Sequence, residues 1–81
     1  MLDELKNTRN RTVGLKQTLR AVEKDEVKAI FIARDAEDRI INNVRSICDT
    51  KAIEVVYAES MVLLGKTCGI DIGTAVAGLL K

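Results

Sequence analysis

The segment best suited to chemistry is Val13–Arg20, where a glycine is followed directly by a helical pattern that carries cations and an amide. If a helix begins after Gly14, Leu19 and Val22 lie within about 40° of Leu15 at 100° per residue. Its donor residues lie at about 100° to 200° from Leu15: they are Lys16, Gln17, Arg20 and Lys24. The first turn of a helix also exposes backbone N–H groups and the positive end of the helix dipole. We therefore expect an anion-binding surface, although an amphipathic helix with solvated basic residues has the same pattern.

The basic residues are concentrated near the beginning of the chain. The sequence has 13 basic and 12 acidic residues, and this net charge of +1 is not typical of a protein that binds polyanions through bulk charge. Residues 5–20, however, contain no acidic residue, and their basic residues are Lys6, Arg9, Arg11, Lys16 and Arg20. We therefore expect a local positive field at one edge of the molecule.

Residues suited to catalysis or metal binding are few. The chain has no histidine, and its two cysteines, Cys48 and Cys68, are not part of a CxxC pair. A zinc site is therefore not expected, and buried thiols are favoured over a disulfide. No nucleophile has a base at a recognisable spacing. We expect neither an enzyme nor a cofactor, with a small nucleotide-binding or catalytic domain as an alternative.

Three glycines, Gly65, Gly69 and Gly73, recur at intervals of four residues. A phosphate-binding loop would need GxxxxGK[ST], or GxGxxG between a strand and a helix, and the sequence contains neither in that place. Lys66 and Asp71 also argue against a membrane helix with a small-residue packing stripe. These glycines are therefore interpreted as structural caps and turns.

Length and composition favour a single small domain over residues 1–81. The core should be aliphatic, because the chain has one Phe, one Tyr and no Trp. The first four residues, MLDE, do not resemble a signal peptide, and no apolar run approaches the roughly 18 residues needed to span a bilayer. We expect a cytoplasmic monomer without a membrane partner.

The hydrophobic pattern predicts alternating strands and helices. Strands are expected at residues 9–13, 29–33, 53–58 and 74–80. A short helical turn around Leu5 should precede them, and longer helices should follow Gly14, Asp35 and Ser60. The two middle strands lack polar alternation and should be covered on both faces. This order predicts an α/β fold, a three-layer α/β/α sandwich around a mixed four-stranded sheet.

Several polar residues and glycines mark the expected ends of these elements. Asp35 is expected to cap the second long helix, with Asp38 in the reciprocal capping position. Ser60 is expected to cap the third helix and Gly69 to end it in a left-handed conformation. Gly78, inside the last strand, indicates a bulge or a close approach of another segment.

The loop before the last strand carries two large aliphatic residues, Ile70 and Ile72. Alternation predicts that at most one of them points into a core. The other either packs on its own domain or meets a ligand. An apolar loop beside a basic helix start is suited to covering an unstacked base while the phosphates around it are held.

Three segments taken together resemble the L7Ae family of ribosomal and kink-turn RNA-binding proteins, particularly its small bacterial members of the YbxF and YlxQ type. The resemblance covers nearly the whole chain. The first segment is residues 14–21 (GLKQTLRA), the second is residues 32–37 (IARDAE), and the third comprises residues 59–61 (ESM) and 64–70 (LGKTCGI). It implies a sandwich that binds a kink-turn, an RNA helix bent sharply at a three-nucleotide bulge next to tandem sheared G·A pairs. A ribosomal or riboswitch-like RNA is the implied partner, DNA is not expected, and a protein-interaction module of the same fold is the alternative.

The resemblance also implies which residues contact RNA. In the family, the helix start after the glycine, here Gly14, reaches the G·A pairs, usually with Asn, Glu and Lys. The matching positions hold Lys16, Gln17 and Arg20, which can still donate to guanine edges or phosphates. Met61 stands where the family has a lysine at the start of a helix. The other implied contacts are Glu37 and Ile41 near the bulge, and Ile70, Ile72 and Ala75 around the flipped-out base.

Overall fold

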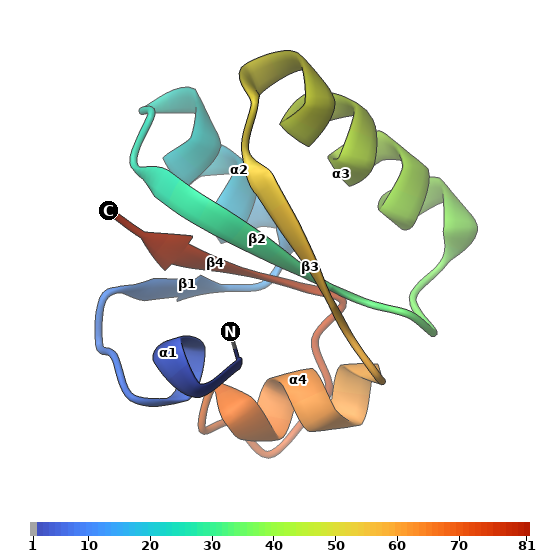
Figure 1. Ribbon diagram of the computed structural model, residues 1–81. Helices are drawn as coiled ribbons and strands as arrows, with labels where there is room; N and C mark the ends of the chain where they lie inside the picture. The colour runs from blue at the N-terminus through green and yellow to red at the C-terminus, as the bar shows by residue number, and fades with distance from the viewer. Residues whose placement is uncertain (1) are drawn as a thin grey trace.

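The computed structural model describes residues 2–81 and contains four helices and four strands (Figure 1). Met1, which the expected domain included, lies outside the described residues. The elements in chain order are α1 (Leu2–Lys6), β1 (Arg11–Val13), α2 (Leu15–Glu23), β2 (Val27–Ala33), α3 (Asp38–Lys51), β3 (Glu54–Ala58), α4 (Met61–Thr67) and β4 (Val76–Leu80). The predicted alternation of strands and helices is confirmed.

The four strands form one mixed sheet in the order β1-β4-β2-β3. Strands β2 and β3 are parallel, with Phe31 opposite Val56, whereas β4 runs antiparallel to both of its neighbours. This topology places the carboxyl ends of β1, β2 and β3 at the same end of the sheet as the beginning of β4. Three helices, α2, α3 and α4, therefore start at that end (Figure 1).

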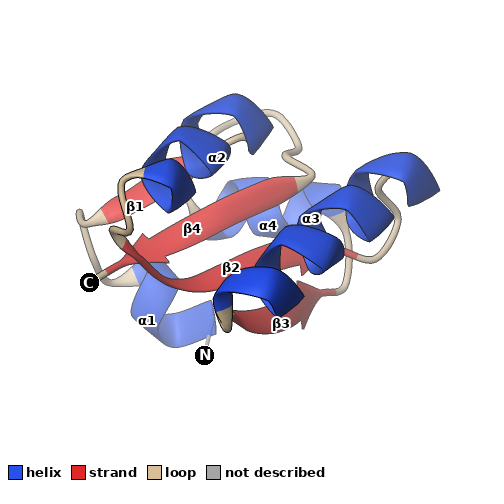
Figure 2. Cartoon of the chain, turned by 90° about the horizontal axis from the view of Figure 1, so that it is seen from above, coloured by secondary structure: helices blue, strands red, loops and turns tan. Residues whose placement is uncertain are grey.

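Helices cover both faces of the sheet, so the predicted three-layer α/β/α sandwich is confirmed (Figure 2). Helices α2 and α3 lie over one face, and α1 and α4 lie over the other. The alternation of side chains along β2 supplies both cores. Phe31 packs with Leu5 and Leu64 on the α1/α4 side, while Ile30 and Ile32 belong to the cluster on the α2/α3 side.

The two middle strands differ in burial. All but one residue of β2 is buried, as the uninterrupted apolar run predicts. The prediction that the strand at residues 53–58 is covered on both faces is confirmed only in part, because its side chains reach both cores but β3 lies at an edge of the sheet. Glu54 is exposed, and Val55, Val56 and Tyr57 are only partly buried. Two similar apolar runs therefore form a central strand in β2 and an edge strand in β3.

The predicted capping role of Asp35 and Asp38 on the second long helix is wrong. Helix α3 begins at Asp38, after Glu37, which makes no side-chain capping bond. Asp35 instead lies in the turn after β2, where its Oδ1 accepts a hydrogen bond from Met61 N at 2.8 Å. Asp35 is thus a cap for α4, a helix far along the chain, because the ends of β2 and β3 lie side by side.

The predicted ends of α4 are confirmed. Ser60 Oγ accepts a hydrogen bond from Leu63 N at 3.0 Å. At the other end, Gly69 has φ 78°, and the N–H groups of Gly69 and Ile70 donate to the carbonyl oxygens of Lys66 and Gly65. These are the two bonds of a Schellman motif.

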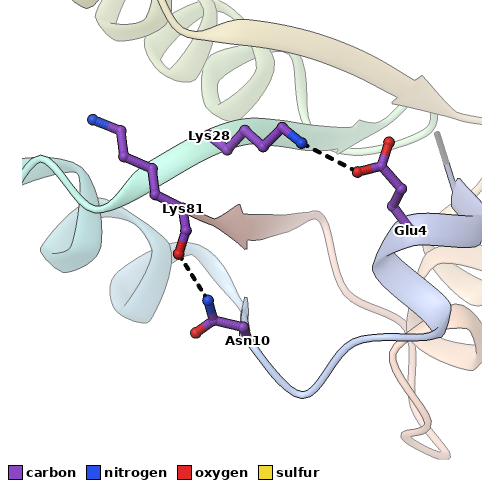
Figure 3. A network of polar contacts seen from close by, with 4 residues as sticks. All are labelled: Glu4, Asn10, Lys28 and Lys81. Atoms are coloured by element: carbon purple, nitrogen blue, oxygen red, sulfur yellow. Dashed lines mark hydrogen bonds and ion pairs between the residues drawn. The ribbon is translucent and has the colours of Figure 1, made fainter.

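The beginning of β1 and the end of β4 are joined by polar contacts (Figure 3). Asn10 Nδ2 donates to the carbonyl oxygen of Lys81 at 2.9 Å, and Leu80 N donates to the carbonyl oxygen of Asn10. On the neighbouring strand, Lys28 pairs with Glu4 of α1 at 3.3 Å. These bonds fix the end of the sheet opposite the three helix starts.

Among residues 2–81, no helix is long and apolar enough to cross a bilayer.

Candidate functional site

Gly14 is the joint between β1 and α2. Its φ of 97° and ψ of 156° belong to a region of backbone conformation that is essentially restricted to glycine. Its N–H donates to Val76 O at 2.9 Å, and its carbonyl oxygen accepts from Thr18 N at 3.1 Å. Gly14 therefore connects the end of edge strand β1 directly to the start of α2 while its own N–H stays bonded to β4.

A shallow open depression of about 510 Å³ surrounds this joint. Its lining consists of Val13, Gly14, Leu15, Lys16, Gln17 and Arg20. The predicted exposure of Lys16, Gln17 and Arg20 is confirmed, since each of these side chains is exposed. A second depression of about 220 Å³ shares Gln17 and Arg20 and continues along α2 to Lys24. The donor-bearing face of α2 is thus a continuous, accessible surface.

The side chain of Gln17 is oriented by the protein itself. Its Oε1 accepts a hydrogen bond from Val13 N at 2.8 Å, which orients the amide and satisfies a backbone donor on the outer side of edge strand β1. The amide nitrogen has no hydrogen-bond partner within residues 2–81 and faces outward as a donor. Gln17 therefore presents an oriented amide N–H donor beside the cations Lys16 and Arg20.

Helix α2 is anchored by a buried hydroxyl pair that the hydrophobic pattern did not reveal. Thr18 is fully buried, and its Oγ1 lies 2.8 Å from Thr12 Oγ1. Gly78 makes room for this pair, because a Cβ at that position would lie 2.5 Å from Thr12 Oγ1. The predicted close approach at Gly78 is confirmed. The helical period places position 18 beside Leu15 and Val22, but the polar residue type of Thr18 did not indicate a core residue.

The acid-free segment 5–20 does not form one positive patch. Arg11 is partly buried, and its guanidinium donates to the carbonyl oxygens of Leu5, Thr8 and Cys68. It therefore joins α1 to the end of α4 on the opposite face of the sheet from α2. By contrast, Lys16, Arg20 and Lys24 form no ion pair within residues 2–81. The exposed positive charge around the depression is thus carried by α2.

The loop between α4 and β4 packs tightly on α4. A Cβ on Gly65 would lie 2.1 Å from Ile72 O, and one on Gly73 would lie 3.1 Å from atoms of Met61. Thr74 N also donates to Met61 O at 3.1 Å. The interpretation of these glycines as structural is confirmed, but Gly65 lies inside α4 rather than at a cap or turn, and Gly65 and Gly73 allow close backbone packing.

The two isoleucines of this loop differ in exposure. Ile70 is half-buried, whereas Ile72 is 75% exposed. The expectation that at most one of them enters a core is confirmed. Because the backbone of Ile72 is held against Gly65, its side chain projects from a fixed support rather than from a free loop.

Hydrogen bonds bring the α2 start and this loop together. Gly14 N donates to Val76 O, and Ala33 N donates to Ala75 O, each at 2.9 Å. Ala75 is partly buried and packs against the cores on both faces of the sheet, as does Ile41 of α3. The predicted site residues Gly14, Ile41 and Ala75 therefore lie at the same end of the sheet.

Glu37 precedes α3 at the same end of the sheet. It is exposed and lies 3.8 Å from Arg39, an ion pair whose members are 71% and 87% exposed. Such an exposed pair contributes little to stability. Glu37 is therefore accessible, although it does not contact the α2 depression.

The candidate site residues predicted from the sequence did not include Arg34, which also lies at this end of the sheet. Arg34 follows β2 directly, is exposed, and its Cζ lies 5.1 Å from the ring centroid of Tyr57. The signal available in the sequence was a cation immediately after a buried strand. Its aromatic partner on the neighbouring strand could be identified only from the strand register, in which Ile32 pairs with Tyr57.

The two cysteines do not form a reactive centre. Both are free and buried, so the preference for two thiols over a disulfide is confirmed. Burial raises the pKa of both thiols; the neighbouring Asp49 adds to this effect at Cys48, and Arg11 opposes it at Cys68. Within the described residues, no cluster of His, Cys, Asp and Glu could hold a metal ion.

The chain matches a known protein family and is similar in sequence to known relatives. Residues 1–80 match the ribosomal protein L7Ae/L30e/S12e/Gadd45 family. The chain is 48% identical over 69 residues to an RNA-binding protein of Halalkalibacterium halodurans, covering 85% of this chain and 84% of the relative. It is 45% identical over 67 residues to an RNA-binding protein of Caldanaerobacter subterraneus, covering 83% and 82%.

Solved structures show the same fold. The 15.5 kDa RNA-binding protein of Giardia lamblia superposes with a TM-score of 0.88 at 25% identity, covering 99% of this chain and 70% of that protein. A Bacillus halodurans protein of unknown function superposes with a TM-score of 0.87 at 22% identity, covering 99% and 83%. The order of elements, the mixed sheet and the three layers are therefore shared with proteins of low sequence similarity.

Proposed function

Because the chain belongs to the ribosomal protein L7Ae/L30e/S12e/Gadd45 family, we propose that it is an RNA-binding protein that recognises the kink-turn. The relatives named as RNA-binding proteins support the first part of this proposal. The observation that carries the second part is the convergence of the α2 start and the α4–β4 loop. Their hydrogen bonds through Val76 and Ala75 hold a donor-rich surface and a projecting aliphatic side chain at one end of the sheet.

The α2 start would bind the sheared G·A pairs. Lys16 and Arg20 present cations without acidic partners in the described chain, and both can donate to guanine O6 and N7 or to phosphates. Gln17 would donate through its amide nitrogen, because the bond from Val13 N to its oxygen fixes the orientation of the amide. This arrangement favours contacts to acceptors, which the major-groove edge of guanine supplies.

The α4–β4 loop would cover the bulged nucleotide. Ile72 offers an exposed aliphatic surface on a support fixed by Gly65, with Ile70 and Ala75 behind it. An unstacked base has an apolar face that gains from such a contact. Glu37 and Ile41, at the start of α3, would lie beside the bulge and complete the contact surface.

The proposed binding would select the kinked conformation of the RNA. A protein that fits only the kinked form shifts the RNA toward it by as much as the difference in affinity between the two forms. This protein would thus act as a folding aid for structured RNA, either ribosomal or riboswitch-like.

A binding titration tests the proposal with two RNAs of equal length. One contains the kink-turn, and in the other Watson–Crick pairs replace the tandem G·A pairs. We expect the first to bind more tightly, with an affinity that falls by about one to two decades between 50 and 200 mM salt if only a few phosphates are contacted. Equal affinities for the two RNAs would contradict kink-turn recognition. Unchanged affinity in Arg20→Ala, together with a stable protein partner, would favour a protein-interaction module instead.

A further inference from the structure

Arg34 lies where β2, β3 and the loop before β4 meet. Its N–H donates to Ala58 O at 2.9 Å, and the preceding residue, Ala33, donates to Ala75 O at the same distance. The following residue, Asp35, is held by its bond to Met61 N. The main chain on both sides of Arg34 is therefore anchored at the end of the sheet that carries the proposed RNA contacts.

The side chain of Arg34 is held by an aromatic ring on the edge strand. Its Cζ lies 5.1 Å from the centroid of Tyr57, which is within the range of cation–π attraction. Tyr57 is itself partly buried against the core on the α2/α3 side of the sheet, so its ring is a stable support. A long side chain held in this way loses less conformational freedom when it binds a ligand.

The charge of Arg34 is not neutralised within the described chain. The ion pairs among residues 2–81 do not include it, and its neighbour Asp35 directs a carboxylate oxygen to Met61 N instead. The guanidinium donates no hydrogen bond within the same residues, and the side chain is exposed. A planar guanidinium with free N–H groups fits the oxygens of a phosphate in a bidentate manner.

From this geometry we propose that Arg34 binds a phosphate of the RNA and that Tyr57 positions it. The proposal rests on the RNA binding argued above. It extends the contact surface from α2, across the end of the sheet, to the edge strand β3. Arg34 and Tyr57 would thus hold the RNA backbone on the α3 side, while Lys16 and Arg20 contact it from α2.

Affinity for the kink-turn RNA between 50 and 200 mM salt tests this proposal. One phosphate contact contributes about 0.9 to the slope of log affinity against log salt on duplex RNA, by analogy with B-form DNA. We expect Arg34→Ala to lose about 3- to 10-fold in affinity at 150 mM salt and to reduce the slope by about one contact. Arg34→Lys, which keeps the charge, should retain the slope.

Tyr57 needs a separate measurement because it acts through Arg34. Tyr57→Leu should weaken binding in the wild-type background but have little further effect in the Arg34→Ala background, which is the result expected of coupled residues. Tyr57→Phe keeps the ring and should bind as the wild type does. The matched control is Arg45→Ala, an exposed arginine of α3 outside the proposed contacts, whose affinity and slope should not change.

The outcomes distinguish this inference from the proposed function. If the wild-type protein prefers the kink-turn RNA but Arg34→Ala keeps the full salt slope, the phosphate contact is overturned and kink-turn recognition stands. A loss of affinity without a change in slope also overturns it, because that loss would come from altered packing. If the wild-type protein does not distinguish the two RNAs, the proposed function fails and this inference fails with it.

Discussion

The N–H of Gly14 donates to the carbonyl oxygen of Val76 at 2.9 Å, so the start of α2 is bonded to the first residue of β4. One residue earlier, Ala75 accepts from Ala33 at the end of β2. The segment that precedes β4 is thus held between two strand ends. This arrangement joins two sequence-distant segments into one surface.

Replacement of Gly14 by alanine should destabilise the fold through the backbone alone. No atom lies within 4 Å of a Cβ built at Gly14, so steric contact is not the cause. The φ of 97° is unfavourable for an L residue, and we expect a loss of about 1 to 3 kcal/mol in the free energy of unfolding. Urea denaturation measures this loss. Lys16→Ala, at an exposed neighbour, should stay within about 0.5 kcal/mol of the wild type, and an equally small effect of Gly14→Ala would contradict the explanation.

Replacement of Gly65 by alanine should displace the α4–β4 loop. A Cβ at Gly65 would lie 2.1 Å from Ile72 O, and backbone cannot be moved aside as a flexible side chain can. We expect a loss of about 1 to 3 kcal/mol in stability and a weaker affinity for kink-turn RNA. NMR chemical-shift changes should concentrate in residues 70–75. Val62→Ala, on the exposed face of the same helix, should leave these shifts in place; changes of equal size in both variants would contradict a specific clash.

The fold could be predicted from the sequence to the level of its layers, because apolar runs and helical stripes depend on local spacing. The order of the strands in the sheet could not be predicted. The burial of residues 53–58 was therefore overestimated, because β3 lies at an edge of the sheet. An apolar run such as VVY does not distinguish a central strand from an edge strand. Asp35 was recognised as a cap, but of the wrong helix, because its partner at Met61 is fixed by the pairing of β2 with β3.

The candidate site likewise has residues that local spacing predicts and contacts that depend on how the strands pair. The glycine, the donors of α2 and the exposed isoleucine were found from residue type and helical period, and the family resemblance supplied Glu37, Ile41 and Ala75. Two side-chain contacts could be predicted neither from the residue pattern nor from the family resemblance. Gln17 bonds to Val13 only because β1 is an edge strand, and Arg34 meets Tyr57 only because of the strand register.

The buried thiols should make stability fall in alkaline solution. Burial raises the pKa of Cys48 and Cys68 in the folded state, so the unfolded chain loses these protons first. Their contribution is fully present below the ordinary thiol pKa and is lost as the pH rises through the raised folded-state pKa. Urea midpoints measured from about pH 8 to 10 should therefore decline. A double Cys→Ala variant should show a shallower decline, and an identical pH dependence would contradict the assignment.

Replacement of Ile72 by alanine should separate binding from folding. The side chain is 75% exposed, so its loss should change the free energy of unfolding by less than about 0.5 kcal/mol. If Ile72 covers a bulged base, removing most of its apolar surface should weaken the affinity for kink-turn RNA by about 1 to 2 kcal/mol. The salt dependence should stay the same, because no charge is removed. Val62→Ala, which removes a similar exposed aliphatic group from α4, is the matched control and should bind as the wild type does. Equal affinities of Ile72→Ala and the wild type would show that the loop does not contact the RNA.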